Sequence, residues 1–433
     1  MTEGREVWIT GAGMLSPIGS GVDANWEAVR GGGCGVERHP QGEGPPLPEN
    51  FLYFGAVEGY GEPPVVPPKL NSQRKFLNRS SILGLHAVQE AVESSGADLF
   101  DIPAGRKALY VGSGDFTRIE YLDFYSAFAQ SSGPDLAPTD PGVLNEKALY
   151  QVNPFYLLEG LTNNMFSFLS ARYEIMGTNG SLTSLSSCGA QALEMCDRAI
   201  RWNKADLGLV VSCGSWIGEL IRFELDGLGI LSRASAGADS FRPLDRRRDG
   251  FFPAEGAAVL VLEAADSARA RGARPMGRVR GTGNFQEVVS RSHIAVPFEA
   301  VARACRSAMS EAEMETSALS FVLPHGSGTK MGDRLEMRAV KDFLGDGADK
   351  VPLAAWKPYT GHMGSASDIG EIILGLRALA EGVLPPTPGF ERAEAEFEVL
   401  DVVASERPVG GEAFLSLSHG LGGQASATLL SAP

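Results

Sequence analysis

The sequence predicts an α/β protein built from two packed halves. At 433 residues the chain is too long for one simple core. Its hydrophobic content of 43% and charged content of 21% are typical of a folded globular protein. Short apolar strands alternate with amphipathic helical segments along most of the sequence, a pattern that favours mostly parallel sheets.

The first half, residues 1–264, begins with an apolar strand that ends in a glycine turn. A stretch rich in proline and glycine at 40–69 has no periodicity and predicts a long surface excursion. Apolar residues at helical spacing predict helices, and short apolar or alternating runs predict strands. The predicted elements are strand 5–13, helix 22–30, helix 81–92, strands 107–112 and 181–185, helix 192–200, and strands 207–213 and 257–263.

The second half, residues 265–433, repeats this alternation of strands and helices. The predicted elements are strand 275–283, helix 297–311, strand 318–324, helix 334–344, strand 351–355, helix 366–381, and strands 398–405 and 413–418. Because both halves carry a strand–helix series, we expect the chain to divide near residue 265.

Composition excludes several classes of function. A net charge of −15 and a pI near 5.0 disfavour nucleic acids and anionic membranes as general partners. The sequence has no run of 18 apolar residues and no basic segment followed by an apolar stretch at its start, so we expect neither a membrane span nor a secretory signal. The five cysteines form no CxxC pair and no metal-ligand spacing, which favours reduced thiols, a cytoplasmic location and no metal.

A turn of small residues joins strand 181–185 to the following helix. It contains Ser186, Ser187 and Cys188. The first amides of a helix lack intrahelical partners and carry about half a positive charge, which favours a nucleophile that develops negative charge there. The competing interpretation is a serine that merely caps the helix.

Two of the six histidines lie in glycine-flanked loops directly after predicted strands. His325 follows strand 318–324, and His362 follows strand 351–355 by a few residues. Either histidine alone could be a buried structural residue. Both together, at the carboxyl ends of strands in one α/β fold, predict a shared catalytic site.

These motifs together resemble the β-ketoacyl-acyl carrier protein synthases of the elongating type, over nearly the whole chain. The resemblance rests on residues 7–19 (VWITGAGMLSPIG), 241–251 (FRPLDRRRDGF) with 255–258, 325–329 (HGSGT), 357–362 (KPYTGH) and 420–423 (GLGG). It implies a thiolase-like fold in which two similar halves form a layered α-β-α-β-α architecture.

In that family a cysteine before a helix is the nucleophile. Ungapped alignment of residues 181–189 (SLTSLSSCG) places Ser186 at the cysteine position, whereas Cys188 would require a two-residue gap. The resemblance therefore implies Ser186, either native or engineered, in the catalytic position. A serine hydroxyl has a far higher pKa than a thiol, so acylation and condensation should be slow, while decarboxylation could survive.

The resemblance also assigns roles to other residues. His325 and His362 stabilise an enolate oxygen, and Lys357 orients the network. The predicted supporting acids are Asp333, Glu336 and Glu371, and the predicted oxyanion and gating loop is Gly420, Leu421, Gly422 and Gly423. Leu421 stands where many relatives have a gating phenylalanine. For His419 we expect a structural role.

The function implied is a ketosynthase-like acyltransferase or condensing enzyme of fatty acid or type II polyketide biosynthesis. The alternatives are a non-condensing partner subunit resembling a chain-length factor, or a malonyl decarboxylase or acyl transferase without condensation. The substrates would be thioesters on an acyl carrier protein, with no further cofactor, and the protein would be a homodimer or heterodimer. The predicted carrier-binding patch is Arg74, Lys75 and Arg79, with 246–248 as a second basic cluster; ordinary solvated charge is the alternative.

Overall fold

The computed structural model describes residues 4–42, 46–62, 64–114, 121–133, 137–154, 163–184, 187–288 and 296–433. Within these ranges the strands are β1 (Val7–Ser16), β2 (Gly19–Ser20), β3 (Glu37–Arg38), β4 (Tyr53–Phe54), β5 (Lys107–Ser113), β6 (Asn179–Leu182), β7 (Leu207–Ser215), β8 (Ser235–Ala238), β9 (Glu255–Ala264), β10 (Gly277–Gln286), β11 (Leu319–Leu323), β12 (Val383–Leu384), β13 (Arg407–Pro408), β14 (Ala413–His419) and β15 (Gln424–Ser431).

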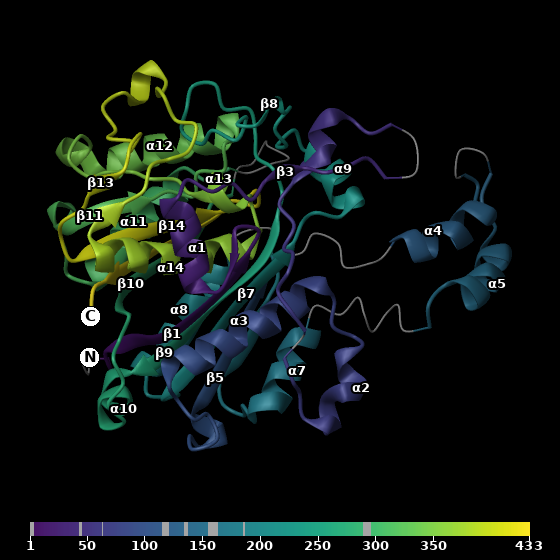
Figure 1. Cartoon of the computed structure of the whole chain (residues 1–433), viewed down its shortest axis with the longest axis horizontal. Coiled ribbons are helices and arrows are strands. Elements are labelled where there is room, and N and C mark those ends of the chain that lie inside the picture. Colours follow the sequence, from purple (N-terminus) through teal and green to yellow (C-terminus); the bar gives the residue numbers. More distant parts are fainter. Residues whose placement is uncertain are drawn as a thin grey trace.

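The helices in the same ranges are α1 (Val22–Arg30), α2 (Asn71–Arg74), α3 (Arg79–Ser95), α4 (Tyr121–Gln130), α5 (Pro141–Gln151), α7 (Asn164–Tyr173), α8 (Cys188–Arg201), α9 (Glu219–Gly227), α10 (Ala265–Ala270), α11 (Glu299–Glu311), α12 (Lys330–Leu344), α13 (Lys357–Thr360) and α14 (Ser365–Glu381). Helices α4 and α5 pack on each other and lie apart from the sheet (Figure 1). None of the described helices is long and apolar enough to cross a membrane.

The large sheet has the strand order β11-β14-β15-β10-β1-β9-β7-β5-β6. The first half supplies β1, β9, β7, β5 and β6, whose successive pairings are antiparallel, antiparallel, parallel and parallel. The second half supplies β10, β15, β14 and β11, whose pairings are antiparallel, antiparallel and parallel. A parallel bridge from Val322 to Leu353 then continues the series. The two halves therefore share one topology, and they join where three residues of β1 pair with β10.

The helices complete five layers. Helix α3 packs on the outer face of β1, β9 and β7, while α11 packs on β10, β15 and β14 and also contacts α12. Helices α8 and α14 lie between the two halves of the sheet, since each contacts strands of both (Figure 1). This α-β-α-β-α order brings the N-termini of α8 and α14 to the centre of the protein. We propose that the halves divide between residues 264 and 265, where β9 ends and α10 begins.

Two sequence expectations about the sheet were wrong. Most neighbouring strands of the described sheet are antiparallel rather than parallel. For one of these pairs the cause is local, because β14 and β15 form a hairpin closed by residues 420–423, and such a hairpin forces the antiparallel arrangement. The predicted strands 351–355 and 398–405 make only isolated bridges at Leu353 and Val402. Pro352 lacks the N–H that a continuous ladder needs there.

Candidate functional site

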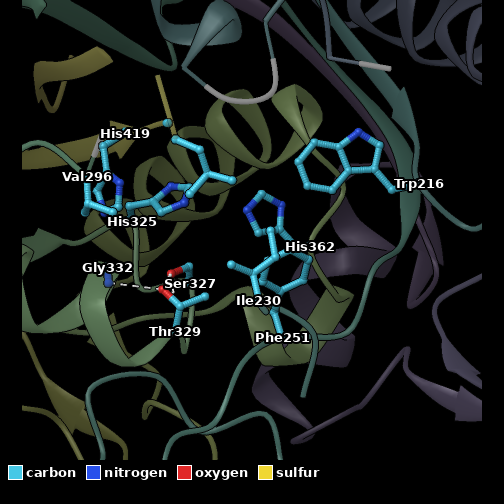
Figure 2. Close-up of a pocket in the computed structure, with 12 residues that line it drawn as sticks. Trp216, Ile230, Phe251, Val296, His325, Ser327, Thr329, Gly332, His362 and His419 are labelled. Carbon is cyan, nitrogen blue, oxygen red and sulfur yellow. Dashed lines mark hydrogen bonds between the residues drawn. The ribbon is translucent and has the colours of Figure 1, made fainter. Parts of the chain in front are cut away.

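His325 and His362 line the same small cavity, of about 40 Å³ (Figure 2). Their ring centroids are 5.3 Å apart and the rings meet edge to face. Both side chains are only 3% exposed. The predicted convergence of the two histidines is therefore what the structure shows. The full lining is Trp216, Ile230, Phe251, Val296, His325, Ser327, Thr329, Gly332, His362, His419, Gly420 and Leu421.

The loop that carries His325 is held by a buried carboxylate. His325 is the second residue after β11, and Gly326 follows it with a φ of 51°, a conformation that favours glycine. Glu336 on α12 accepts the backbone N–H groups of His325 and Gly326 at 2.6 and 2.9 Å. Asp333, one turn earlier, accepts the N–H of Gly328 at 2.9 Å. Both acids thus fix the loop and leave the imidazole free to face the cavity.

Lys357 lies behind His325 and does not line the cavity. Its Nζ donates to the backbone oxygen of His325 at 2.6 Å and to Glu371 at 2.7 Å. Burial raises the pKa of Glu371 to about 7, against the lowering influence of Lys357. Lys357 touches the backbone of His325 rather than the cavity, a position that fits the network-orienting role predicted for it.

His362 is held by its own loop and by aromatic rings. Its Nδ1 accepts the N–H of Gly364 at 3.2 Å, so the neutral ring carries its proton on Nε2. Trp216 stacks on the imidazole at 4.8 Å, and Phe251 lies 4.7 Å away. Burial and the nearby Lys357 hold the pKa of both His325 and His362 well below 6.5, so both are neutral near pH 7. Two neutral imidazoles can each donate one N–H to an oxygen in the cavity.

A third histidine, His419 at the end of β14, also lines this cavity. Its ring centroid lies 4.3 Å from that of His325, and its Nε2 lies 3.8 Å from a carboxylate oxygen of Glu336. Burial alone would raise the pKa of Glu336, but the contact with His419 and the two backbone amides hold it below 4.5. The structure thus places His419 in the cavity wall, and its structural role stays a prediction.

A larger outer chamber of about 740 Å³ adjoins the histidine cavity. The two spaces share Ile230, Val296, Thr329, Gly332 and Leu421 as lining residues. Leu421 thus stands at their boundary, which fits the predicted gating position. Gly420 also lines the inner cavity. Gly422 and Gly423 do not; Gly423 closes the hairpin by donating its N–H to the oxygen of Gly420 at 3.1 Å.

The predicted nucleophile Ser186 lies outside the described residues. Cys188, the alternative, does not line the cavity and is fully buried as the first residue of α8. Its Sγ lies 3.6 Å from the backbone oxygen of Ser184, and burial raises its pKa to about 11. A thiol in this position is neither accessible nor acidic. The structure therefore gives no support to Cys188, and Ser186 stays the prediction.

Each predicted basic cluster contains an arginine that forms an ion pair with an acid. Arg79 forms a 2.5 Å ion pair with the fully buried Glu255, so its charge is largely neutralised. Neither Arg79, Arg74 nor Lys75 lines the outer chamber. In the second cluster, Arg248 is itself buried and lies 3.9 Å from Asp333. The carrier-binding role of Arg74, Lys75 and Arg79 stays a prediction.

Sequence reasoning missed Trp216 and Asp368. Trp216 is the first residue after β7, the same strand-end position that singled out the histidines, so the signal was available. Asp368 is a buried acid in the first turn of α14. An acid in the first turn of a helix is usually explained by its favourable interaction with the helix dipole. Only the packing of α14 against α8 shows that Asp368 accepts backbone N–H groups of α8. Within the described ranges, no group of His, Cys, Asp and Glu side chains could hold a metal ion.

Comparison with known proteins identifies two family models on this chain. The model described as "Beta-ketoacyl synthase, N-terminal domain" matches residues 4–268, and "Beta-ketoacyl synthase, C-terminal domain" matches 276–391. The 3-oxoacyl-[acyl-carrier-protein] synthase 2 of Vibrio harveyi is 26% identical over 427 residues, covering 97% of this chain and 96% of the relative. A putative polyketide beta-ketoacyl synthase 1 of Streptomyces cyaneus is 28% identical over 434 residues, covering 99% and 98%.

Solved structures show the same fold. A beta-ketoacyl synthase from Burkholderia phymatum has a TM-score of 0.83 at 23% identity, with 99% of this chain and 100% of that chain covered. The AntDE:AntF complex, described as a type II polyketide synthase acyl carrier protein with its ketosynthase bound to the hexaketide, has a TM-score of 0.83 at 22% identity and the same coverage. The ishigamide ketosynthase/chain length factor has a TM-score of 0.81 at 24% identity, again with 99% and 100% covered. The thiolase-like fold predicted from the motifs is thus confirmed.

Proposed function

The chain belongs to the β-ketoacyl synthase family, and we propose that it is a ketosynthase-like acyltransferase acting on thioesters of an acyl carrier protein. The observation that carries this proposal is the pair of neutral imidazoles, His325 and His362, in one buried cavity next to a larger chamber. The chamber would receive the phosphopantetheine arm of the carrier, and the cavity its thioester. No other cofactor is needed for this chemistry.

The histidine pair suits decarboxylation of a malonyl thioester. When the bond between the α-carbon and the carboxylate breaks, its electrons move into the thioester as an enolate, and carbon dioxide leaves. The N–H groups of His325 and His362 would stabilise the enolate oxygen, and their burial strengthens that interaction. A neutral donor is required here, and the depressed pKa of each ring supplies it near pH 7.

Ser186 is the proposed site of acyl attachment. Ser187 and Cys188 are both fully buried, which favours the hydroxyl of Ser186 as the nucleophile of this turn. A serine must lose its proton to a base as it attacks, and the oxygen ester it forms is a poorer electrophile than a thioester. We therefore expect slow acyl transfer, and decarboxylation that is less affected than condensation.

We propose an acyl carrier protein and a second ketosynthase-like subunit as partners. Of the three solved structures described above, one is an acyl carrier protein in complex with its ketosynthase and another is a ketosynthase/chain length factor. In this chain β6 is the last strand of the described sheet, so its outer edge offers backbone groups to a partner. Either a homodimer or a heterodimer would satisfy that edge. The proposed location is the cytoplasm.

A second candidate function is a non-condensing subunit that supports a ketosynthase, because the cysteine position holds serine. One experiment separates the two. The purified protein is incubated with acyl-carrier and malonyl-carrier, while protein mass and carbon dioxide release are followed. A mass gain with carbon dioxide release supports the enzyme. If neither occurs, and the protein co-purifies with a cysteine-bearing homologue, the enzyme proposal is wrong and the partner role is supported.

A further inference from the structure

Helix α8 begins without a cap from its own segment. The residue before it, Ser187, has a left-handed backbone with φ 64°, and its side chain makes no capping hydrogen bond. Its buried hydroxyl has no partner among the described residues. The first amides of a helix need an acceptor, so another part of the chain must supply one.

Asp368 on α14 supplies that acceptor. One carboxylate oxygen accepts the N–H groups of Gly189 and Ala190 at 3.2 and 3.4 Å, and the other accepts the hydroxyl of Ser418 at 2.6 Å. The contact is tight, because a Cβ at Gly189 would lie 2.7 Å from the backbone oxygen of Ser365. Asp368 is only 3% exposed. A buried carboxylate therefore occupies the positive end of the helix that follows Ser186.

We propose that Asp368 is a positioning residue that opposes an anion at the start of α8, and so adapts this site to a hydroxyl nucleophile rather than a thiolate. The inference rests on the proposed role of Ser186. A free helix N-terminus would stabilise a thiolate through its dipole and its unpaired amides. A carboxylate bound to those amides offsets the helix dipole, and its negative charge repels a thiolate at the same helix end.

A hydroxyl tolerates this environment because it need not ionise first. As its oxygen bonds to the thioester carbon, its proton passes to a neutral imidazole. The carbon–sulfur bond then breaks, and the same proton goes to the departing carrier thiolate. The products are the serine ester and the free carrier thiol, and no anionic nucleophile accumulates at the helix end.

The charge on Asp368 depends on the groups that face it. Burial raises its pKa to about 6, while Ser418, Lys357 and the two amides of α8 act in the opposite direction. The carboxylate of Glu371 on the same helix and the thiol of Cys188 on α8 also interact with it. Above pH 6 the carboxylate is ionised, so the opposition to a second anion is fully present at pH 7 to 8.

The test uses S186C as a reporter, with the exposed Cys34 removed by C34S. The rate of alkylation by iodoacetamide at position 186, located by peptide mass spectrometry, is measured against pH with and without D368N. Asparagine keeps the shape and the acceptor but removes the charge. We expect D368N to lower the apparent pKa of the introduced thiol by at least about one unit, which corresponds to roughly tenfold more thiolate at pH 7.

The matched control is D197N. Asp197 is a fully buried carboxylate on α8 itself. It pairs with Arg201 at 2.7 Å, toward the C-terminal end of the helix. D197N should leave the pH profile unchanged. D368A serves as a second variant, and circular dichroism checks folding of all variants.

Three results would overturn the inference. The first is an unchanged profile in both D368N and D368A. The second is an equal shift in D197N, because charge loss anywhere on the helix would then explain the effect. The third is absence of alkylation at position 186 at every pH, which would refute the proposed role of Ser186 itself. A labelled but unshifted thiol, by contrast, refutes only the role of Asp368.

Discussion

Removing Lys357 should destabilise the protein in a way that a second substitution partly repairs. The ammonium group is 1% exposed and bonds the backbone oxygen of His325 and the carboxylate of Glu371. K357M leaves that carboxylate buried without its partner. Breaking a buried ion pair in this way typically costs about 3–5 kcal/mol. We expect a loss of this size at pH 8, where the wild-type protein, in which Glu371 has a pKa of about 7, holds the ion pair. Without Lys357, which lowers that pKa, the buried carboxyl must either stay charged and unpaired or take up a proton, and both outcomes cost stability.

The double variant K357M/E371L replaces both charges with apolar groups, so it should regain at least about 2 kcal/mol relative to K357M. At pH 6 the loss in K357M should be smaller, because Glu371 can take up a proton. The control is R38M, which breaks a surface pair with Glu49 whose side chains are 50% and 55% exposed, and which should leave the free energy of unfolding nearly unchanged.

Urea denaturation followed by circular dichroism at pH 6 and pH 8 gives the free energies of unfolding. The reasoning is refuted if the double variant is no more stable than K357M at pH 8. It is equally refuted if K357M costs no more than R38M.

Three further predictions follow from the cavity. H325N and H362N should each lower carbon dioxide release from malonyl-carrier by about 10²- to 10⁴-fold, because each removes a proton-donating ring that the enolate needs; activity within tenfold of the wild type would contradict this. H419F should move the acidic limb of the decarboxylation pH profile to higher pH, because burial, Lys357 and His419 together lower the pKa of His325 and the substitution removes one of these influences; an unmoved limb would show that His419 does not act on His325. E371Q should flatten the pH dependence of stability between pH 4.5 and 7. Burial raises the pKa of Glu371 from 4.5 to about 7, so the folded protein keeps a proton that the unfolded chain releases, and stability falls as pH rises through this window; equal changes in melting temperature from pH 5 to pH 7 in both proteins would contradict it.

Much of the fold follows from local pattern in the sequence. The sequence predicts helix 22–30 with the bounds that α1 has, and eight of the ten predicted strands match observed strands within three residues at both ends. Whether neighbouring strands run parallel or antiparallel was harder to predict, because a strand's neighbours depend on contacts between distant segments. The hairpin at 420–423 shows this. The sequence predicts an oxyanion and gating loop there, and the structure shows that the same residues also form the turn that joins two antiparallel strands.

The site was predictable where a motif places a residue after a strand, as for His325 and His362. It was not predictable where helices from the two halves meet. Asp368 accepts the amides of α8 although nearly 180 residues separate them, because α8 and α14 share the central layer. His419 lies beside His325 because its strand, β14, is the parallel neighbour of β11. No spacing along the chain encodes such contacts.

The position of the acyl group on the protein tests the central claim most directly. After incubation with acyl-carrier, peptide mass spectrometry locates the adduct, and hydroxylamine at neutral pH distinguishes a labile thioester from a more resistant oxygen ester. We predict an oxygen ester on Ser186, and none in S186A. A thioester on Cys188 would contradict the account, because that thiol is buried away from the cavity lined by His325 and His362.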